Sequence, residues 1–351
     1  MKHHMIEKQD ENVTESDIEA LELFLGSTAC SNGTMINKLD LRKYFAIIAL
    51  TVLTSSQSLL IVWSKRAGKY EHSVTTADFL VEVLKCALSL VALFKIWRSD
   101  GITQDNKLST SFDEVSVYSI PAALYLIKNL LQYSIFAYVD ARMYQILSNL
   151  NIISTGVLYS LILKRKLTQG QWIAFILLYV GYTGSQLDAS DSVRNIPPQG
   201  WVMVIVMALI SGFGGVQTEA ILKKRPSRNI NVQNFWLSIF GVIFTLIAIY
   251  DNDFDELISK GFFHGYSFIT LCMILNHALS RIAMSMVLKY ANNIVMVYST
   301  RVAITIADIL SKFLFGLNLN MEFLACFPLV FISAVFYRTV ESKWCYQPLF
   351  T

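Results

Sequence analysis

Long runs of apolar residues, separated by short polar segments, recur along most of the chain. Four of these runs contain no charged residue: Tyr44–Trp63, Tyr144–Leu163, Gly170–Leu187 and Asn231–Tyr250. A helix of about 20 apolar residues spans the core of a bilayer, so each run predicts a membrane-spanning helix. Six more runs are similarly apolar but carry one or more charges: Thr76–Trp97, Tyr118–Tyr138, Gly200–Leu222, Phe262–Leu288, Ile294–Leu317 and Leu319–Tyr337. The pattern therefore predicts an all-α polytopic membrane protein with ten transmembrane helices.

Composition supports a membrane protein and removes several other classes. Of the 351 residues, 54% are apolar and 16% charged, whereas a soluble domain carries about 25% charged residues. The formal net charge of +3 gives no basic field for nucleic acid. The five cysteines are scattered and include no CxxC pair, so neither a disulfide framework nor a zinc site is expected.

The two ends of the chain are expected to lie in the cytosol. Residues 1–43 are polar and acidic, without the basic segment and apolar core of a signal peptide, and predict a cytosolic N-terminal tail. Most Lys and Arg residues of the predicted loops fall on the same side of the membrane as this tail. Loops rich in Lys and Arg usually lie in the cytosol, so the tail is predicted to be cytosolic. An even number of spans then places residues 339–351 in the cytosol as a C-terminal tail.

A weak internal repeat relates the two halves of the chain. A shift of 152 residues aligns Tyr138-Val-Asp-Ala with Tyr290-Ala-Asn-Asn, and a predicted span follows each segment. The halves, residues 44–190 and 191–338, would each hold five helices, so they would enter the membrane from opposite sides. Inverted repeats of this kind are typical of alternating-access transporters that bind substrate near mid-membrane. Without the repeat, ten helices equally suit a channel, a scaffold or an intramembrane enzyme.

Polar residues inside two spans form helical stripes. In the third span the stripe consists of Tyr125, Lys128, Asn129 and Gln132. In the fourth it consists of Tyr144, Ser148, Asn151 and Thr155, with Gln145 and Asn149 nearby. Polar groups within a bilayer face protein or water, so the stripes predict either a hydrophilic cavity or hydrogen bonds between helices. The number of polar groups favours the cavity.

The sixth span contains the small-residue segment Ser211-Gly212-Phe213-Gly214-Gly215, followed by Glu219. Small residues let another helix or a ligand approach the backbone closely, and the sequence leaves both interpretations open.

Charged residues within the spans raise the question of their partners. Glu82 and Lys85 lie one turn apart and are expected to pair, as are Asp308 and Lys312. Arg281 and Arg301 have no acidic partner within one turn. Each therefore reaches another helix or meets an anionic ligand.

Motifs of enzyme chemistry are absent from the sequence. It has no HExxH, no phosphate-binding Gly-Lys-Ser/Thr loop and no GxSxG. We therefore expect no enzymatic activity, no cofactor and no metal site.

Several segments resemble a known family. They are Asp140-Ala141, Tyr144–Leu147, Asn149–Asn151, Ile152–Lys166, Ser211–Phe213 with Gly215 and Glu219, Lys260–Tyr266, and Asn293-Ile294. They are similar to nucleotide-sugar transporters of the CMP-sialic acid/UDP-galactose branch, and most of all to plant CMP-sialic acid transporter-like proteins. The resemblance implies the drug/metabolite transporter fold, ten helices in two inverted repeats. It also implies a Golgi membrane location and exchange of a cytosolic nucleotide sugar for a lumenal nucleoside monophosphate.

The resemblance also implies a substrate site. Its residues would be Tyr125, Asn129, Tyr144, Gln145, Asn151, Ser211, Gly212, Gly215, Asn293 and Tyr298. Lys128, Arg281 and Arg301 are candidates for anion contacts. The chain departs from the family pattern at several positions: Arg142, Met143, Ser148, Gln217, Arg281, Asn292, Met296 and Arg301. Where this chain has Ser148 and Met296, the family pattern has lysines.

By this resemblance the first expectation is import of a CMP-linked acidic sugar in exchange for CMP. A UDP-sugar transporter, a transporter of another anionic metabolite, and a transport-inactive paralogue that partners active homologues stay open. The endoplasmic reticulum is the second choice of compartment. The sequence does not fix the oligomeric state, and a homodimer is among the arrangements that it allows.

Overall fold

The computed structural model describes residues 33–66, 73–108, 111–135, 138–139, 141–164, 167–186, 197–315 and 321–345. Several sequence-based predictions fall outside them: most of the N-terminal tail, the last six residues, and the Asp140 segment. The side chains of Asn129, Gln132, Arg142, Gln145 and Lys312 also lie outside the described part. The predicted Asp308–Lys312 pair therefore stays a prediction.

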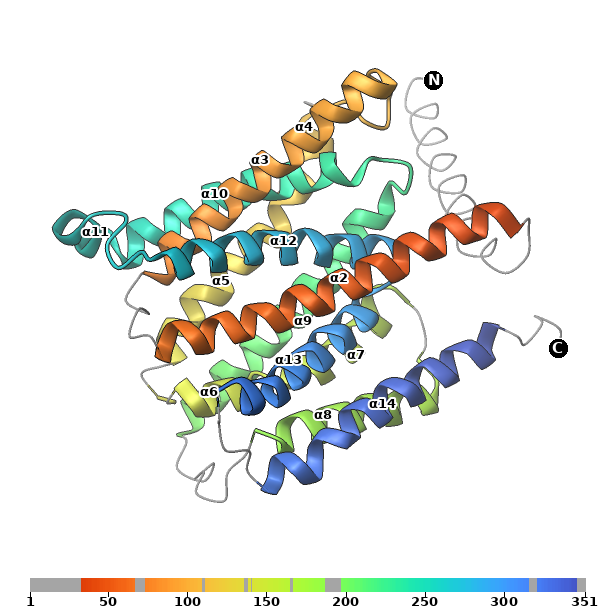
Figure 1. The fold of residues 1–351 in the computed structure, drawn as a ribbon, viewed down its shortest axis with the longest axis vertical. Coiled ribbons are helices and arrows are strands. Elements are labelled where there is room, and N and C mark those ends of the chain that lie inside the picture. The colour runs from red at the N-terminus through yellow and green to blue at the C-terminus, as the bar shows by residue number, and fades with distance from the viewer. Residues whose placement is uncertain are drawn as a thin grey trace, which may run out of the picture.

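The described residues form helices joined by loops (Figure 1). The first half contains α2 (Gly33–Arg66), α3 (Val74–Asp100), α4 (Phe112–Val115), the 3-10 helix η1 (Ser116–Tyr118), α5 (Ser119–Ile135), α6 (Ala141–Leu147), α7 (Leu150–Ile162) and α8 (Gln169–Gly184). The second half contains α9 (Pro198–Lys224), α10 (Ile230–Asn252), α11 (Phe254–Lys260), α12 (Phe268–Tyr290), α13 (Asn293–Phe315) and α14 (Met321–Cys345). The all-α prediction is confirmed for the described part of the chain.

Six helices among the described residues are long and apolar enough to cross a membrane. They are Leu41–Ser64, Pro198–Lys224, Ile230–Asp251, Phe268–Tyr290, Asn293–Ser311 and Phe323–Val340. The other predicted spans are helical but more charged or shorter: α3 carries Asp78, Glu82 and Lys85, while α5, α7 and α8 have 17, 13 and 16 residues. The six helices make the chain a multi-pass membrane protein.

The fourth apolar run is not the single helix that its pattern predicts. It divides into α6 and α7, and between them the N–H of Asn149 donates to the carbonyl of Ile146 at 3.2 Å, and that of Asn151 to Ser148 at 3.1 Å. Hydrogen bonds between residues three apart are typical of a 3-10 turn, which is tighter than an α-helical turn. Ser148 and Asn149 are residue types whose side chains compete for backbone hydrogen bonds and favour turns. The stripe predicted over Tyr144–Thr155 is therefore not one continuous helix face.

Two helix starts also differ from the hydropathy pattern. The run predicted over Phe262–Leu288 begins with a turn, because Gly261 and Gly265 adopt positive φ angles of 85° and 72°. The helix starts only at α12, where Ser267 and Thr270 form a capping box. At the other end of the chain α2 begins at Gly33, inside the segment predicted as a tail, so its helix extends beyond the apolar run.

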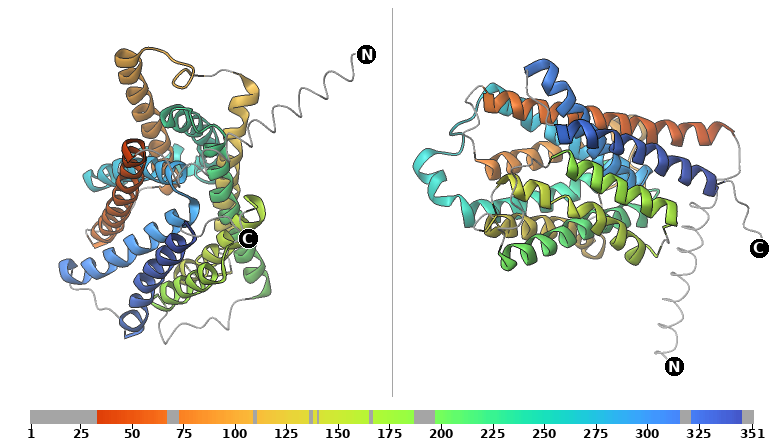
Figure 2. Two further views of the ribbon diagram at one scale, coloured as in Figure 1. Left: turned by 90° about the vertical axis from the view of Figure 1, so that its right-hand side faces the viewer. Right: turned by 90° about the horizontal axis from the view of Figure 1, so that it is seen from below.

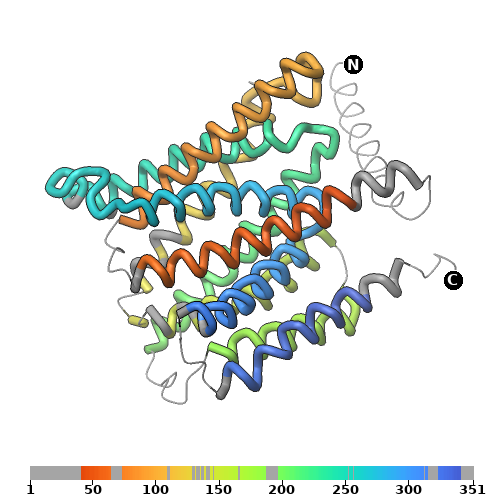
Figure 3. The backbone as a smooth tube through the Cα atoms, viewed as in Figure 1, coloured from red at the N-terminus to blue at the C-terminus, as the bar shows by residue number. Residues whose placement is uncertain are grey.

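Long helices pack side by side along their lengths (Figures 1 and 2). α2 packs on α12 and α13, α9 on α5 and α7, α3 on α10, and α14 on α8. α3 and α10 lie at one edge of the bundle, and α8 and α14 at the opposite edge; Figure 3 follows the same path as a tube. The start of α2 and the end of α14 lie at the same end of the bundle.

Candidate functional site

One polar cluster in the bundle interior links α3, α5 and α12. The guanidinium of Arg281 forms ion pairs with Asp78 at 2.8 Å and Glu82 at 2.7 Å. Glu82 also pairs with Lys85 at 2.9 Å, as the sequence predicts. The hydroxyl of Tyr125 donates to Asp78 at 2.6 Å and lies 2.9 Å from Arg281 Nη2. Two carboxylates balance two cations here, so the cluster is neutral.

A second cluster links α7, α8 and α13. Arg301 Nη2 donates to Asn151 Oδ1 at 2.9 Å, and Nη1 lies 3.4 Å from Asn149 Oδ1. The guanidinium carbon also lies 4.7 Å from the centre of the Tyr182 ring. Among the described residues Arg301 forms no ion pair, and its Nε is buried without a hydrogen-bond partner. Amides and an aromatic face stabilise this cation but leave its charge uncompensated.

Lys128 lies on α5, one turn after Tyr125, and is half-buried. Among the described residues it forms no ion pair, whereas Asp78 is paired with Arg281. Lys128 and Arg301 are therefore two cations of the interior without matching carboxylates in the described part of the chain. Buried positive charge of this kind favours an anion.

The glycines of α9 allow close contact with two other helices. A Cβ on Gly212 would lie 2.7 Å from Ser154 Oγ, and a Cβ on Gly215 would lie 2.8 Å from Asn293 Oδ1. Real Cβ atoms are not found this close to other atoms, so both positions need glycine for packing. Of the two interpretations of this segment, helix packing describes the structure.

Glu219 joins α9 to the first turn of α13. Its Oε2 accepts from the backbone N–H of Asn293 at 2.6 Å, and its Oε1 accepts from Lys223 at 2.7 Å. A carboxylate at a helix N-terminus stabilises the unpaired amides there. Oδ1 of Asn293 is itself buried without a hydrogen-bond partner among the described residues. It lies beside Gly215, one turn before Glu219 in α9. Buried polar atoms are normally paired, so this oxygen and Arg301 Nε are two exceptions on α13.

A glycine comparison within α9 tests the packing account. We expect Gly212→Ala to lower the stability of the protein by about 1–3 kcal/mol, because the added methyl group meets Ser154 and the adjacent backbone. Gly214→Ala is the matched control, since its Cβ would lie no closer than 3.9 Å to Leu124. Thermal unfolding in detergent measures both. Equal unfolding temperatures for the two variants would contradict the close contact.

Two of the predicted site tyrosines lie among packed side chains. The hydroxyl of Tyr144 lies 3.0 Å from the sulfur of Met207 on α9. Tyr298 is buried on α13, where it stacks on Tyr337 with ring centres 5.0 Å apart and lies 3.1 Å from the Ser333 hydroxyl. In this conformation both rings contribute to packing. Ser211 is half-buried on α9, and Met296, at one departure from the family pattern, packs against apolar side chains.

Several contacts of the site were not predicted from sequence. Asp78 completes a charged face with Glu82 and Lys85 at four- and seven-residue spacing, a signal that could have indicated it. Tyr182 is one of two tyrosines, with Tyr179, in the apolar helix α8, and nothing in the sequence around it marks it as a partner of Arg301. No group of three His, Cys, Asp or Glu side chains among the described residues is arranged to hold a metal.

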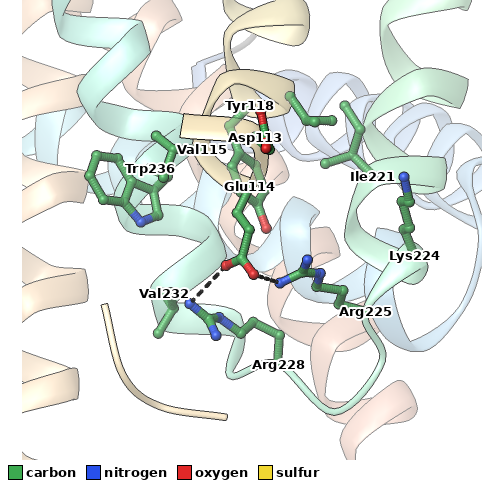
Figure 4. Close-up of a pocket in the computed structure, with 11 residues that line it drawn as sticks. Asp113, Glu114, Val115, Tyr118, Ile221, Lys224, Arg225, Arg228, Val232 and Trp236 are labelled. Carbon is green, nitrogen blue, oxygen red and sulfur yellow. Dashed lines mark ion pairs between the residues drawn. The ribbon is translucent and has the colours of Figure 1, made fainter. Parts of the chain in front are cut away.

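A cavity of about 480 Å³ opens at the end of the bundle where α2 begins and α14 ends. It is lined by the third turn of α2 and by the ends of α3, α9, α10 and α12. Its charged lining residues are the cations Arg42, Lys223, Arg228 and Lys289 and the carboxylates Asp100 and Asp105. Beside it a smaller pocket separates α4 and η1 from the α9–α10 loop (Figure 4). There the carboxylate of Glu114 forms ion pairs with Arg225 and, at 3.8 Å, with Arg228. These pairs link the α9–α10 loop to α4.

Comparison with known proteins identifies the family. A family model described as "Nucleotide-sugar transporter" matches residues 38–338, which is most of the chain. The chain belongs to the nucleotide-sugar transporter family. A family of transporters confirms the expectation that the protein is not an enzyme, and it confirms the resemblance found in the sequence.

Individual relatives of this transporter carry two kinds of name. It is 65% identical to "CMP-sialic acid transporter 2" of Oryza sativa subsp. indica, over 88% of this chain and 86% of the relative. It is 59% identical to "CMP-sialic acid transporter 4" of Arabidopsis thaliana, over 95% and 97%. A more distant relative, at 30% identity over 84% and 82%, is "UDP-galactose/UDP-N-acetylglucosamine transporter srf-3" of Caenorhabditis elegans.

A solved crystal structure shares the fold. It aligns with a TM-score of 0.62 and 12% sequence identity, over 87% of this chain and 98% of its own. Because the identity is low, the likeness concerns the fold alone.

Proposed function

We propose that this transporter exchanges a nucleotide sugar for a nucleoside monophosphate, and that Arg301 binds the phosphate. The observation that carries the proposal is the uncompensated charge of Arg301, which lies among the amides of Asn149 and Asn151 at the break between α6 and α7. Broken helices at mid-membrane are where transporters of this kind bind substrate. Arginine matches the geometry of phosphate oxygens, and amides can read the edge of a pyrimidine.

The proposal assigns different roles to the three candidate anion contacts. Arg281 is neutralised by Asp78 and Glu82, so its role is structural. Arg301 faces no carboxylate among the described residues, so its charge is available to the ligand, and Lys128 stays a predicted anion contact from the resemblance. Asn129 and Gln145 stay predicted contacts from the resemblance, since their side chains are outside the described part.

An inverted repeat of two five-helix units underlies the proposed mechanism of alternating access. The 152-residue shift equates Ala141 with Asn293, the first residues of α6 and α13. It also equates Asn149 with Arg301, and these two side chains contact each other. Residues related by a two-fold axis touch only near that axis, so the contact supports an axis through the polar site.

Helix packing supports the same repeat, with residues 44–190 and 191–338 as its units. If α2, α3, α5, α6–α7 and α8 correspond to α9, α10, α12, α13 and α14, each major contact has its counterpart. The contact of α2 with α12 matches that of α9 with α5, and α2 with α13 matches α9 with α7. α3 with α12 likewise matches α10 with α5, while α3–α10 and α8–α14 are pairs of equivalent helices.

The proposed orientation places both chain ends in the cytosol, in a Golgi membrane. The loop charges and the position of α2 and α14 ends on one side of the bundle support this orientation. The 480 Å³ cavity then opens to the cytosol, where its lysines and arginines, which outnumber the carboxylates of Asp100 and Asp105, would attract an anionic nucleotide sugar.

For the substrate we propose a CMP-linked acidic sugar, because the relatives at 65% and 59% identity are named CMP-sialic acid transporters. A UDP-sugar is the second candidate, favoured by the name of the Caenorhabditis relative.

A reconstituted exchange assay tests the proposal. Liposomes containing the purified protein are loaded with CMP, with UMP or with buffer, and labelled CMP-sialic acid or a UDP-sugar is added outside. We expect CMP-loaded liposomes to accumulate CMP-sialic acid faster than empty ones. Exchange of UDP-sugars for UMP alone would establish the second candidate. Failure of every CMP- and UDP-sugar to exchange would reject the function.

A further inference from the structure

A groove that shares only Tyr298 with the predicted substrate site lies between α2, α13 and α14. It has a cavity volume of about 190 Å³. α13 packs on both α2 and α14 and forms the floor of the groove, while α14 packs along α8 (Figure 1). Ile47, Val295 and Ala334 give the groove an apolar lining.

The groove has a cationic end. Lys43 and Arg338 line it there, together with Tyr44. The Arg338 Nη2 lies 3.0 Å from the Tyr44 hydroxyl, and its guanidinium carbon lies 5.4 Å from the centre of the Tyr44 ring. Among the described side chains neither Lys43 nor Arg338 forms an ion pair with a carboxylate. Two cations therefore stand at this end without a balancing charge.

The position of the groove in the membrane defines what can reach it. Lys43 lies near the start of the apolar span Leu41–Ser64, and Arg338 near the end of the span Phe323–Val340. Cationic and aromatic side chains at span ends lie at the level of the lipid headgroups. Phe45 and Ile48, which follow the lining residues Tyr44 and Ile47 in α2, are 63% and 62% exposed, as expected for a helix that faces acyl chains.

We propose that this groove binds one anionic phospholipid, with its phosphate between Lys43 and Arg338 and an acyl chain against α13. Charge decides the occupant: two unbalanced cations next to an apolar channel match a lipid that is anionic at one end and hydrocarbon along the rest. Because Tyr298 and Ser299 of α13 also line the groove, the lipid would pack against the helix that carries Arg301.

Native mass spectrometry of the detergent-purified full chain tests the proposal. The protein is mixed with equal amounts of phosphatidylinositol and phosphatidylcholine, and retained lipid is measured. We expect the wild type to retain phosphatidylinositol preferentially. Lys43→Gln with Arg338→Gln should reduce that retention about thirtyfold, since each cation contributes about fivefold to attraction of an anionic headgroup. Arg338 is exposed and Lys43 half-buried, and neither forms an ion pair within the described residues, so the variant is expected to fold.

Two further variants isolate the groove. Lys95→Gln with Arg98→Gln removes two exposed cations of α3 outside the groove and should leave retention unchanged. Ala334→Phe fills the groove without changing charge and should also release the lipid. Equal retention of both lipids by the wild type, or unchanged retention by the Lys43/Arg338 variant, would overturn the proposal. A groove covered by a second copy of the chain would give the latter result together with a dimer mass.

Discussion

Arg301→Gln is expected to lower the rate of nucleotide-sugar exchange roughly a hundredfold, because it removes the uncompensated positive charge at the proposed phosphate site. Glutamine can still donate a hydrogen bond toward Asn151, so the contact between α7 and α13 has a replacement. Loss of exchange should therefore occur with little loss of folded protein. The measurement is initial uptake into CMP-loaded liposomes, normalised to the amount of reconstituted protein.

Two companion variants show whether the charge itself is responsible. Arg301→Lys keeps the charge but lacks the planar fork, so we expect it to retain part of the activity. Lys95→Gln removes an exposed cation on α3 and should exchange like the wild type. If Arg301→Gln exchanged as fast as the Lys95 control, the phosphate would bind elsewhere.

Arg281→Met, unlike Arg301→Gln, should mainly lower the stability of the protein. Removing the guanidinium leaves Asp78 beside the Glu82–Lys85 pair with the hydrogen bond from Tyr125 but without a cation of its own. Loss of one member of a buried ion-pair cluster costs about 3–5 kcal/mol. We expect a clearly lower unfolding temperature in detergent, and a lower yield of monodisperse protein.

A compensating variant checks that charge balance is the cause. In the combination Arg281→Met with Asp78→Asn, Lys85 still balances Glu82, so the cluster is again neutral. Its unfolding temperature should recover most of the loss. A double variant less stable than Arg281→Met alone would show that the geometry of Arg281, rather than neutrality, holds α3 against α12.

The helices were predictable because hydropathy reports directly on burial in lipid. Every apolar run is mainly helical within the described residues, although the fourth run divides into two helices, and the local pair of Glu82 and Lys85 formed as its spacing predicts. Boundaries failed where local backbone chemistry competes with hydropathy. Ser148 and Asn149 carry no charge and so did not interrupt the pattern, yet their position divides α6 from α7. Likewise the positive φ at Gly261 delays α12.

The partners of the two arginines were not predictable from spacing. Asp78 and Glu82 lie 203 and 199 residues from Arg281 in the sequence. Asn151 lies 150 residues from Arg301. From the sequence, each arginine could either contact another helix or bind an anionic ligand. Only the three-dimensional arrangement distinguishes these two roles: Arg281 contacts two carboxylates, whereas Arg301 contacts amides and a tyrosine ring.

The most direct test of Arg301 as the phosphate contact compares CMP with cytidine. Their affinities for the purified wild type and for Arg301→Gln can be measured by isothermal titration or by the shift in unfolding temperature. The wild type should bind CMP far more tightly than cytidine, and the variant should bind the two with similar affinity. A preference for CMP that survives the substitution would contradict the assignment of the phosphate to Arg301.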